Sequence, residues 1–263
     1  MGSATRVAIA NAKAALAARS GAATLAAAEA LFSAGHVIGD SAQLQTAFTD
    51  TSADEKAKNA LVAAVFSGMK PEARDLLSGL VSSRWSKPSD VLSGIEEIGI
   101  RIAALSAESS VDLPAELFAF GSAVSSNAEL ELAVANKLGD PAAKTALIDA
   151  LLKGKASGQT TAIIQHLVRQ PRGRRIGALL RHAASIIADQ HAQAVATVTV
   201  ATPLSDAQVL RLEAGLAKKY GAVRVNQIVD ASIIGGMRIA VGDIVIDDSI
   251  ATRVNELKLQ LAG

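Results

Sequence analysis

The residues of this sequence that could do chemistry do not fall into a catalytic pattern. The four histidines, His36, His166, His182 and His191, lack the spacing of a zinc-binding motif and are interpreted as surface or packing residues. The absence of cysteine excludes disulfides, thiolate metal sites and a cysteine nucleophile. No glycine-rich phosphate loop and no serine nucleophile elbow occurs either. The sequence therefore predicts no catalytic centre, no metal site and no cofactor.

Acidic residues and glycines near the C-terminus have a structural explanation. Asp243, Asp247 and Asp248 could hold a cation, but they flank a predicted hairpin, and a turn followed by a helix N-cap needs the same residue types. The pair Gly235 and Gly236 is interpreted as a turn with a positive φ angle rather than as a phosphate site. We therefore expect all of these residues to shape the backbone.

Positive charge is concentrated between residues 169 and 181. The run consists of Arg169, Arg172, Arg174, Arg175 and Arg181, with Pro171 and Gly173 among them. No aromatic residue is interleaved with these arginines, and the chain as a whole carries a formal net charge of only +1, so RNA binding ranks third. A solvated loop leading into a helix is the first interpretation, and an acidic protein partner is the second.

The composition describes the elements that must position these residues. Half of the 263 residues are apolar and only 3% are aromatic, and alanine is abundant, which favours packed helices over an aromatic β core. No stretch reaches the roughly 20 apolar residues of a membrane span, and no secretory signal or lipidation motif is present at the N-terminus. The length predicts either one large domain or two to three small ones.

An internal repeat organises the helical part of the chain. Residues 31–68 align with residues 117–154 at an offset of 86 without a gap, and thirteen of the aligned positions are identical. The non-alanine identities include Leu31/Leu117, Phe32/Phe118, Gly35/Gly121, Leu44/Leu130, Asp54/Asp140, Lys58/Lys144, Leu61/Leu147 and Gly68/Gly154. We expect a duplicated helical bundle of about 85 residues per copy. Among the helix signals, Asp140–Pro141 predicts an N-terminus, and Ser52 with Glu55 predicts a capping box.

The pattern changes to alternation near residue 194. Residues 195–200 predict a strand, Ser205 with Gln208 predicts a capping box for a helix to Lys219, and residues 223–228 predict a second strand. Residues 237–241 and 244–246 predict a hairpin, and apolar residues at helical spacing follow from Ile250 to Leu261. The predicted fold is mainly α, with a duplicated helical bundle before a small β-α-β-β-β-α domain. The predicted units are 1–105, 106–190 and 191–263.

The C-terminal segment contains a specific motif: an acidic residue after a strand, an apolar residue before Gly-Gly, an alternating apolar run and Gly-Asp. Its residues are Asp230, Ile233, Gly235, Gly236, Ile239, Gly242, Asp243 and Ser249. In this motif the sequence resembles the delta subunit of rotary F-type ATP synthases. Ala240 departs from the family, which usually has a polar or charged side chain there. The resemblance extends back to about residue 95. The additional N-terminal copy resembles the extended delta subunits of actinobacteria.

This resemblance implies a non-catalytic connector in the stator of the synthase. The helical bundle would bind amphipathic N-terminal helices of the alpha subunits, and the α/β domain would bind the C-terminal end of the b subunit. The protein would lie peripherally at the cytoplasmic face of the plasma membrane, as part of the complex. Candidate partner-binding residues are Phe118, Arg172, Arg174 and Arg175. The duplicated copy would add a second helix-docking face or lengthen the connector.

Other classes of protein remain as alternatives. A helical-repeat adaptor of another complex would share the bundle but would not copurify with synthase subunits. An enzyme ranks third because the sequence offers no nucleophile–base pair and no metal set. A nucleic-acid-binding protein ranks last, and its affinity would fall steeply with salt.

Overall fold

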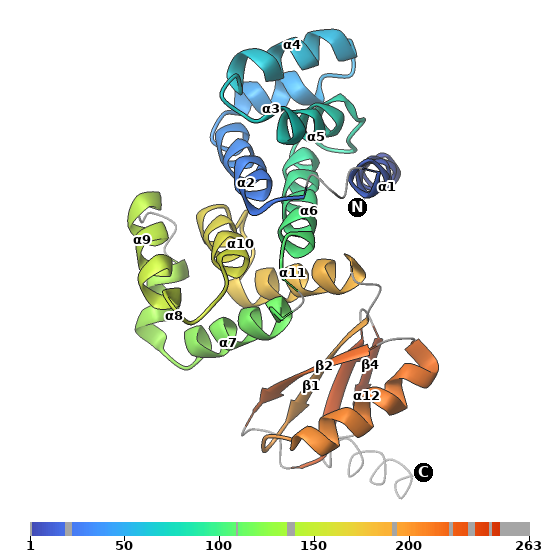
Figure 1. Ribbon diagram of the computed structural model, residues 1–263, viewed down its shortest axis with the longest axis vertical. Coiled ribbons are helices and arrows are strands. Elements are labelled where there is room, and N and C mark those ends of the chain that lie inside the picture. Colours follow the sequence, from blue (N-terminus) through green and yellow to red (C-terminus); the bar gives the residue numbers. More distant parts are fainter. Residues whose placement is uncertain are drawn as a thin grey trace, which may run out of the picture.

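The computed structural model describes residues 2–18, 23–108, 110–135, 140–190, 194–220, 223–230, 235–241 and 244–247. Within these residues the chain forms a long helical part followed by a small mixed sheet with one helix, so the predicted fold class is confirmed (Figure 1). The helices are α1 (Ser3–Ala17), α2 (Leu25–Gly39), α3 (Ala42–Thr49), α4 (Glu55–Val65), α5 (Pro71–Ser82), α6 (Asp90–Leu105), α7 (Leu113–Ser125), α8 (Ala128–Ala135), α9 (Pro141–Leu152), α10 (Gly158–Arg169), α11 (Ile176–Gln190) and α12 (Asp206–Tyr220).

Side-chain caps fix where several of these helices begin. The side chains of Thr24, Ser41, Asp112 and Ser157 each accept a hydrogen bond from a backbone N–H group of the first turn. Asp140 caps α9 in the same way and Pro141 stands in its first turn, as predicted.

One predicted cap is wrong, because α4 has no capping box between Ser52 and Glu55. Asp54 is the N-cap of α4, and its carboxylate accepts from the backbone N–H of Ala57 at 2.6 Å. Glu55 is therefore the first residue of the helix rather than the third, two positions too early for its side chain to close the box.

The sequence repeat corresponds to a repeat of helices and of helix contacts. Helices α3 and α8 are offset by 86 residues at both ends, and α2, α4 and α5 correspond to α7, α9 and α10. In the first copy α2 packs on α3, α5 and α6, and α4 packs on α5. In the second copy α7 packs on α8, α10 and α11, and α9 packs on α10. The two copies therefore share one packing scheme.

Helix α6 occupies a place in both copies. It closes the first copy as α11 closes the second, and it also opens the second copy as α1 opens the first. Helix α1 packs on α5 and α6, and α6 packs in the equivalent way on α10 and α11. The buried positions of α1 and their counterparts on α6 agree, namely Thr5/Val91, Ala8/Gly94, Ile9/Ile95 and Leu16/Ile102. Figure 1 shows α6 between α1 and α2. We propose that the predicted units overlap at α6, so that a boundary at residue 105 does not separate them.

The C-terminal part has a sheet with the strand order β2-β1-β3-β4. Its strands are β1 (Ala194–Val200), β2 (Val223–Val229), β3 (Met237–Val241) and β4 (Ile244–Asp247). Strands β1 and β2 are parallel and joined through α12, whereas β3 lies antiparallel to both β1 and β4, which confirms the predicted strands and hairpin. The backbone N–H and hydroxyl of Ser205 both donate to Oε1 of Gln208, which is one half of the predicted capping box, whereas the backbone N–H of Gln208 donates to the carbonyl of Ser205 rather than to its hydroxyl. The predicted helix between Ile250 and Leu261 lies outside the described residues.

The two parts have separate hydrophobic cores. One continuous cluster runs through α1 to α11 and includes Leu31, Ile95, Leu117 and Ile187. A second, smaller cluster is formed by β1, β2, β3 and α12. Among the described residues, no helix is long and apolar enough to cross a membrane.

Candidate functional site

The C-terminal motif residues within the described part of the chain lie where the sheet turns. Gly236 has a φ angle of +82°, which favours glycine, and leads directly into β3. Ile239 is buried in β3, and the backbone N–H of Asp230 donates to the carbonyl of Val200 at 2.9 Å after β2 ends. Gly235 precedes Gly236 and is half-buried. Four further motif or hairpin residues, Ile233, Gly242, Asp243 and Ser249, lie outside the described residues, as do Asp248 and His191.

A close contact between the two helical copies forms where α10 crosses α2. A Cβ atom added at Gly35 would lie 3.1 Å from Ile95 and 3.7 Å from His166, so glycine lets α2 approach both α6 and α10. The ring of Phe32 stacks on that of His166 with centroids 4.4 Å apart. Nδ1 of His166 lies 2.9 Å from Nε2 of His36, and Nε2 of Gln170 donates to the carbonyl of Gly35 at 3.0 Å. This contact holds the copies together.

The arginine-rich segment contributes to the same contact through a buried carboxylate. Nη1 and Nη2 of Arg174 donate to the two carboxylate oxygens of Glu96, at 2.9 and 2.6 Å. Nη2 of Arg172 lies 2.8 Å from Oε2 of Glu96, and its Nη1 donates to Ser93 at 2.8 Å. The Glu96 side chain is only 2% exposed. The first interpretation, a solvated loop, is therefore wrong for Arg172 and Arg174, although a partner contact of these residues stays a prediction.

The electrostatics of this cluster favour an ionised Glu96 and neutral histidines. Burial raises the pKa of Glu96, but the His166 ring and the two guanidinium groups outweigh it and hold that pKa well below its usual range. Burial and the neighbouring His166 and Arg169 lower the pKa of His36 to about 3. Burial also lowers the pKa of His166, although Glu96 opposes this shift.

The orientation of the two imidazoles follows from the charge of Glu96. Nε2 of His166 lies 3.8 Å from Oε2 of Glu96, which is too long for a direct hydrogen bond, and it has no other partner among the described residues. A proton on this nitrogen faces the carboxylate favourably, so Nδ1 of His166 is the acceptor and Nε2 of His36 is the donor. The cluster His36, His166, Glu96, Arg172 and Arg174 is hereafter the seam cluster.

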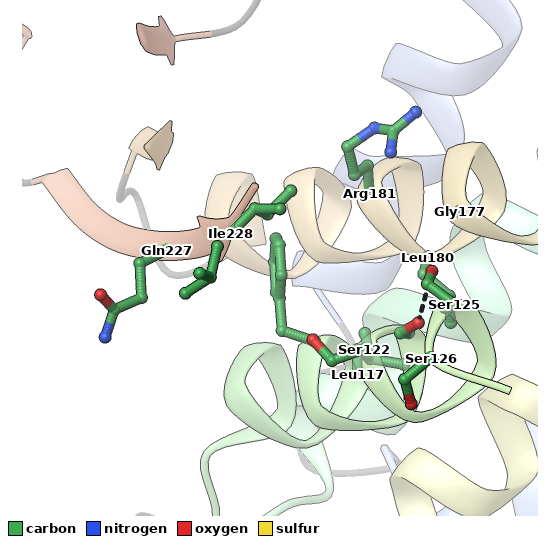
Figure 2. Close-up of a pocket in the computed structure, with 12 residues that line it drawn as sticks. Leu117, Ser122, Ser125, Ser126, Gly177, Leu180, Arg181, Gln227 and Ile228 are labelled. Carbon is green, nitrogen blue, oxygen red and sulfur yellow. Dashed lines mark hydrogen bonds between the residues drawn. The ribbon is translucent and has the colours of Figure 1, made fainter. Parts of the chain in front are cut away.

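In the second copy, the face formed by α7 and α11 corresponds to the α2/α6 face of the first copy, and it is open. A cavity of about 500 Å³ lies between α7, α11 and β2. Figure 2 shows Leu117 and Ser122 on α7, Leu180 on α11, and Ile228 facing them from β2. Phe118 lines the cavity and is half-buried, and Arg181 rises from α11 at its rim. Arg175, the remaining predicted partner-binding residue, is exposed before α11 and does not line the cavity.

Sequence analysis missed the most informative residue, Glu96. The only signal was a weak one, because Glu96 and Glu97 stand together between Ile95 and Ile98, and a buried carboxylate needs a cationic partner such as the arginine-rich segment. No group of three or more potential metal ligands occurs among the described residues.

A duplicated helical unit joined to a small α/β part is the class of protein that this fold defines. The sequence profile of the ATP synthase delta (OSCP) subunit family matches residues 102–261. An ATP synthase subunit delta from Leifsonia xyli is 54% identical over 263 residues, which is 100% of both chains. Those from Streptomyces avermitilis and an Arthrobacter species are 39% and 37% identical, covering 84% and 92% of this chain and 82% and 92% of their own. The chain belongs to the ATP synthase delta (OSCP) subunit family, which confirms the resemblance.

Proposed function

We propose that this protein is a non-catalytic subunit of the peripheral stalk of ATP synthase. It would link the catalytic head, through the N-termini of the alpha subunits, to the b-subunit stalk, and so support the coupling of proton flow to ATP synthesis. Its place would be peripheral, at the cytoplasmic face of the plasma membrane, and it would need no cofactor. The family match over residues 102–261 and a relative that aligns with the whole chain support this proposal.

The observation that carries the linking role is the pair of separate cores. A helical part and an α/β part that each have their own hydrophobic cluster can each bind a different partner without sharing packing. The helical part would bind alpha-subunit helices, and the α/β part would bind the b subunit. Small side chains on the helices allow a partner helix to approach closely.

The N-terminal copy supports a second helix-docking face on α1. Val7, Ala10 and Ala14 are exposed at helical spacing, and Val7 is 59% exposed. Their counterparts on α6 include Ser93 and Glu96, which are covered by the arginines of the second copy.

The experiment mixes the full chain with the isolated catalytic head of the same synthase and, separately, with a soluble b-subunit fragment, followed by size-exclusion chromatography. Binding to both is expected. Binding of folded protein to neither would overturn the proposal and favour an adaptor of another complex.

Matched variants test the α1 face within the same assay. Ala10→Trp places a large side chain on the exposed face, whereas Gln43→Trp does so on the exposed side of α3. Weaker head binding by Ala10→Trp alone is expected. Equal binding by the two variants would remove α1 from the interface and leave the extended connector as the role of the N-terminal copy.

A further inference from the structure

The occupied face of the first copy is a template for the open face of the second. On the first face, Gly35 of α2 contacts Ile95 of α6, with 3.1 Å to the Cβ position. On the second, Gly121 of α7 contacts Leu180 of α11, with 3.2 Å to the Cβ position. The two glycines occupy equivalent positions of the repeat, so the helix pairs α2/α6 and α7/α11 cross at the same point.

These equivalent faces differ in what covers them. Helix α10 and the arginine-rich segment cover the α2/α6 face, where Phe32 is 3% exposed and Gly35 is buried. The counterparts Phe118 and Gly121 are half-buried, and Ser122, the counterpart of His36, is exposed at the cavity. The second face thus has the geometry of a surface that accepts a helix, without the helix.

The side chains that line the open face are compatible with the apolar side of an amphipathic helix. The hydroxyls of Ser125 and Ser126 donate to the carbonyls of Gly121 and Ala123 in their own helix, at 2.9 and 3.0 Å. They therefore present few unmet hydrogen-bonding groups to an occupant. Ile228 and the half-exposed Val229 of β2 add apolar surface on the opposite side.

The positive charge of Arg181 at the edge of the cavity favours an acidic residue on the bound helix. In the register set by the two glycine contacts, the residue after Ile95 is Glu96 and the residue after Leu180 is Arg181. The first face uses its carboxylate to hold two arginines, and the second face offers an arginine instead. Arg181 is the only charged residue among the described ones that line the cavity, so a carboxylate on the occupant complements it.

We infer that the α7/α11 face, bounded by β2, binds an amphipathic α-helix of a partner chain that carries an acidic side chain facing Arg181. This inference rests on the proposed function, because it assigns a face to one of the helices that the stator subunit would hold. The bound helix would contact both the helical part and the α/β part, and would therefore brace one against the other.

The test uses the full chain and two short synthetic amphipathic helices. Both keep the apolar spacing of Ile163, Ile164 and Leu167 of α10, and one has glutamate and the other lysine beside the apolar stripe. Titrations by calorimetry, with backbone NMR shifts as the site readout, are expected to show tighter binding of the glutamate helix by about three- to tenfold. The shifts should concentrate on α7, α11 and β2.

Charge reversal provides the first pair of variants. Arg181→Glu is expected to reverse the preference, so that the lysine helix binds more tightly. Arg211→Glu makes the same charge change at an exposed position of α12 outside the cavity and should leave the preference unchanged. An unchanged preference in Arg181→Glu would overturn the assignment of an acidic partner.

Steric blocking provides the second pair. Ser122→Trp fills the open face, whereas Ala123→Trp places the same side chain at the adjacent exposed position, which does not line this cavity. Loss of helix binding in Ser122→Trp alone, with melting temperatures equal to that of the parent, is expected. Equal binding by both variants, or the absence of shifts on α7 and α11, would overturn the site.

The outcome is separable from that of the proposed function. If the full chain binds the catalytic head but neither synthetic helix binds at α7 and α11, only this inference fails. If the helices bind there but the chain binds neither the head nor the b fragment, the docking face stands and the stator role fails.

Discussion

The α2/α6 face and the α7/α11 face are built from equivalent helices of a repeat, yet one is covered by the chain itself and the other is open. Glycines at the same repeat position bring each helix pair together. The covered face has His36 and Glu96, where the open face has Ser122 and Arg181. The difference teaches that a few polar residues, rather than the apolar framework, decide whether such a face binds its own chain or a partner.

Helix α6 also explains why the N-terminal copy cannot simply be deleted to compare the two faces. Twelve of its sixteen residues are buried, so it has no face left for solvent. Deletion of α1 to α5 would uncover the α2 and α5 contacts of α6 and expose Ile95 and Ile98. Point substitutions are therefore the appropriate probes of either face.

The largest expected effect comes from breaking the seam cluster at Glu96. Glu96→Gln removes the charge that pairs with Arg172 and Arg174, and leaves two partly buried guanidinium groups without a counter-ion. We expect the free energy of unfolding to fall by about 3 kcal/mol, the low end for a broken buried pair because both arginines keep some exposure. Urea denaturation followed by circular dichroism measures it.

Glu72→Gln is the matched control for this substitution. Glu72 is exposed in the first turn of α5, and its loss should change stability by less than about 0.5 kcal/mol. A Glu96→Gln protein as stable as the control would show that the covered face is held by apolar packing alone.

The next effect separates the two faces through their glycines. Gly35→Leu would insert a side chain between α2, α6 and α10, where Ile95 and His166 leave no space, and should cost about 2 to 3 kcal/mol. Gly121→Leu meets only Leu180 within 4 Å, and its side chain can extend toward the cavity, so a cost of about 1 kcal/mol or less is expected. Equal losses of melting temperature would contradict the difference between a covered and an open face.

Acid should weaken the covered face through its two buried histidines. The pKa of His36 falls from 6.5 to about 3 on folding, so the unfolded chain binds this proton more tightly. The stability is therefore complete above pH about 6.5 and decreases as the pH falls below that value. At pH 5 the loss from His36 alone is about 2 kcal/mol, and His166 adds to it because its pKa is also lowered.

Denaturation curves at pH 7 and pH 5 test this dependence. The lowered pKa of Glu96 acts only below the ordinary range of a carboxyl group, so it does not mask the histidines in this interval. His36→Ser installs the residue of the open copy at Ser122 and should reduce the pH dependence, whereas substitution of the exposed His182 should not. A parent protein whose stability is the same at both pH values would contradict the assignment of neutral, buried imidazoles.

The sequence was sufficient for the elements and for the family, because both depend on local patterns. The offset of 86 residues predicted the equivalence of α2 and α7 from Leu31 and Phe32, and alternation predicted β1 to within one residue. The seam cluster was not predicted, because His36, Glu96 and Arg174 lie far apart in the chain and meet only through packing. The cavity was not predicted either. Periodicity places Phe32 and Phe118 at equivalent apolar positions, but it does not show that Phe32 is buried whereas Phe118 is only half-buried.

The smallest expected effect concerns the ion pair that joins the outer helices across α6. Nζ of Lys13 on α1 lies 2.7 Å from Oδ2 of Asp189 on α11, but the two side chains are 40% and 56% exposed. Water and salt screen such a pair, so Lys13→Ala should change stability by less than about 0.5 kcal/mol. Arg101 contacts the same Asp189 oxygen from α6 and is only 3% exposed, so Arg101→Ala should cost clearly more. If the two variants were equally stable in urea, burial would not be what separates the covered surfaces of this protein from its exposed ones, and the contrast between the two faces would need another cause.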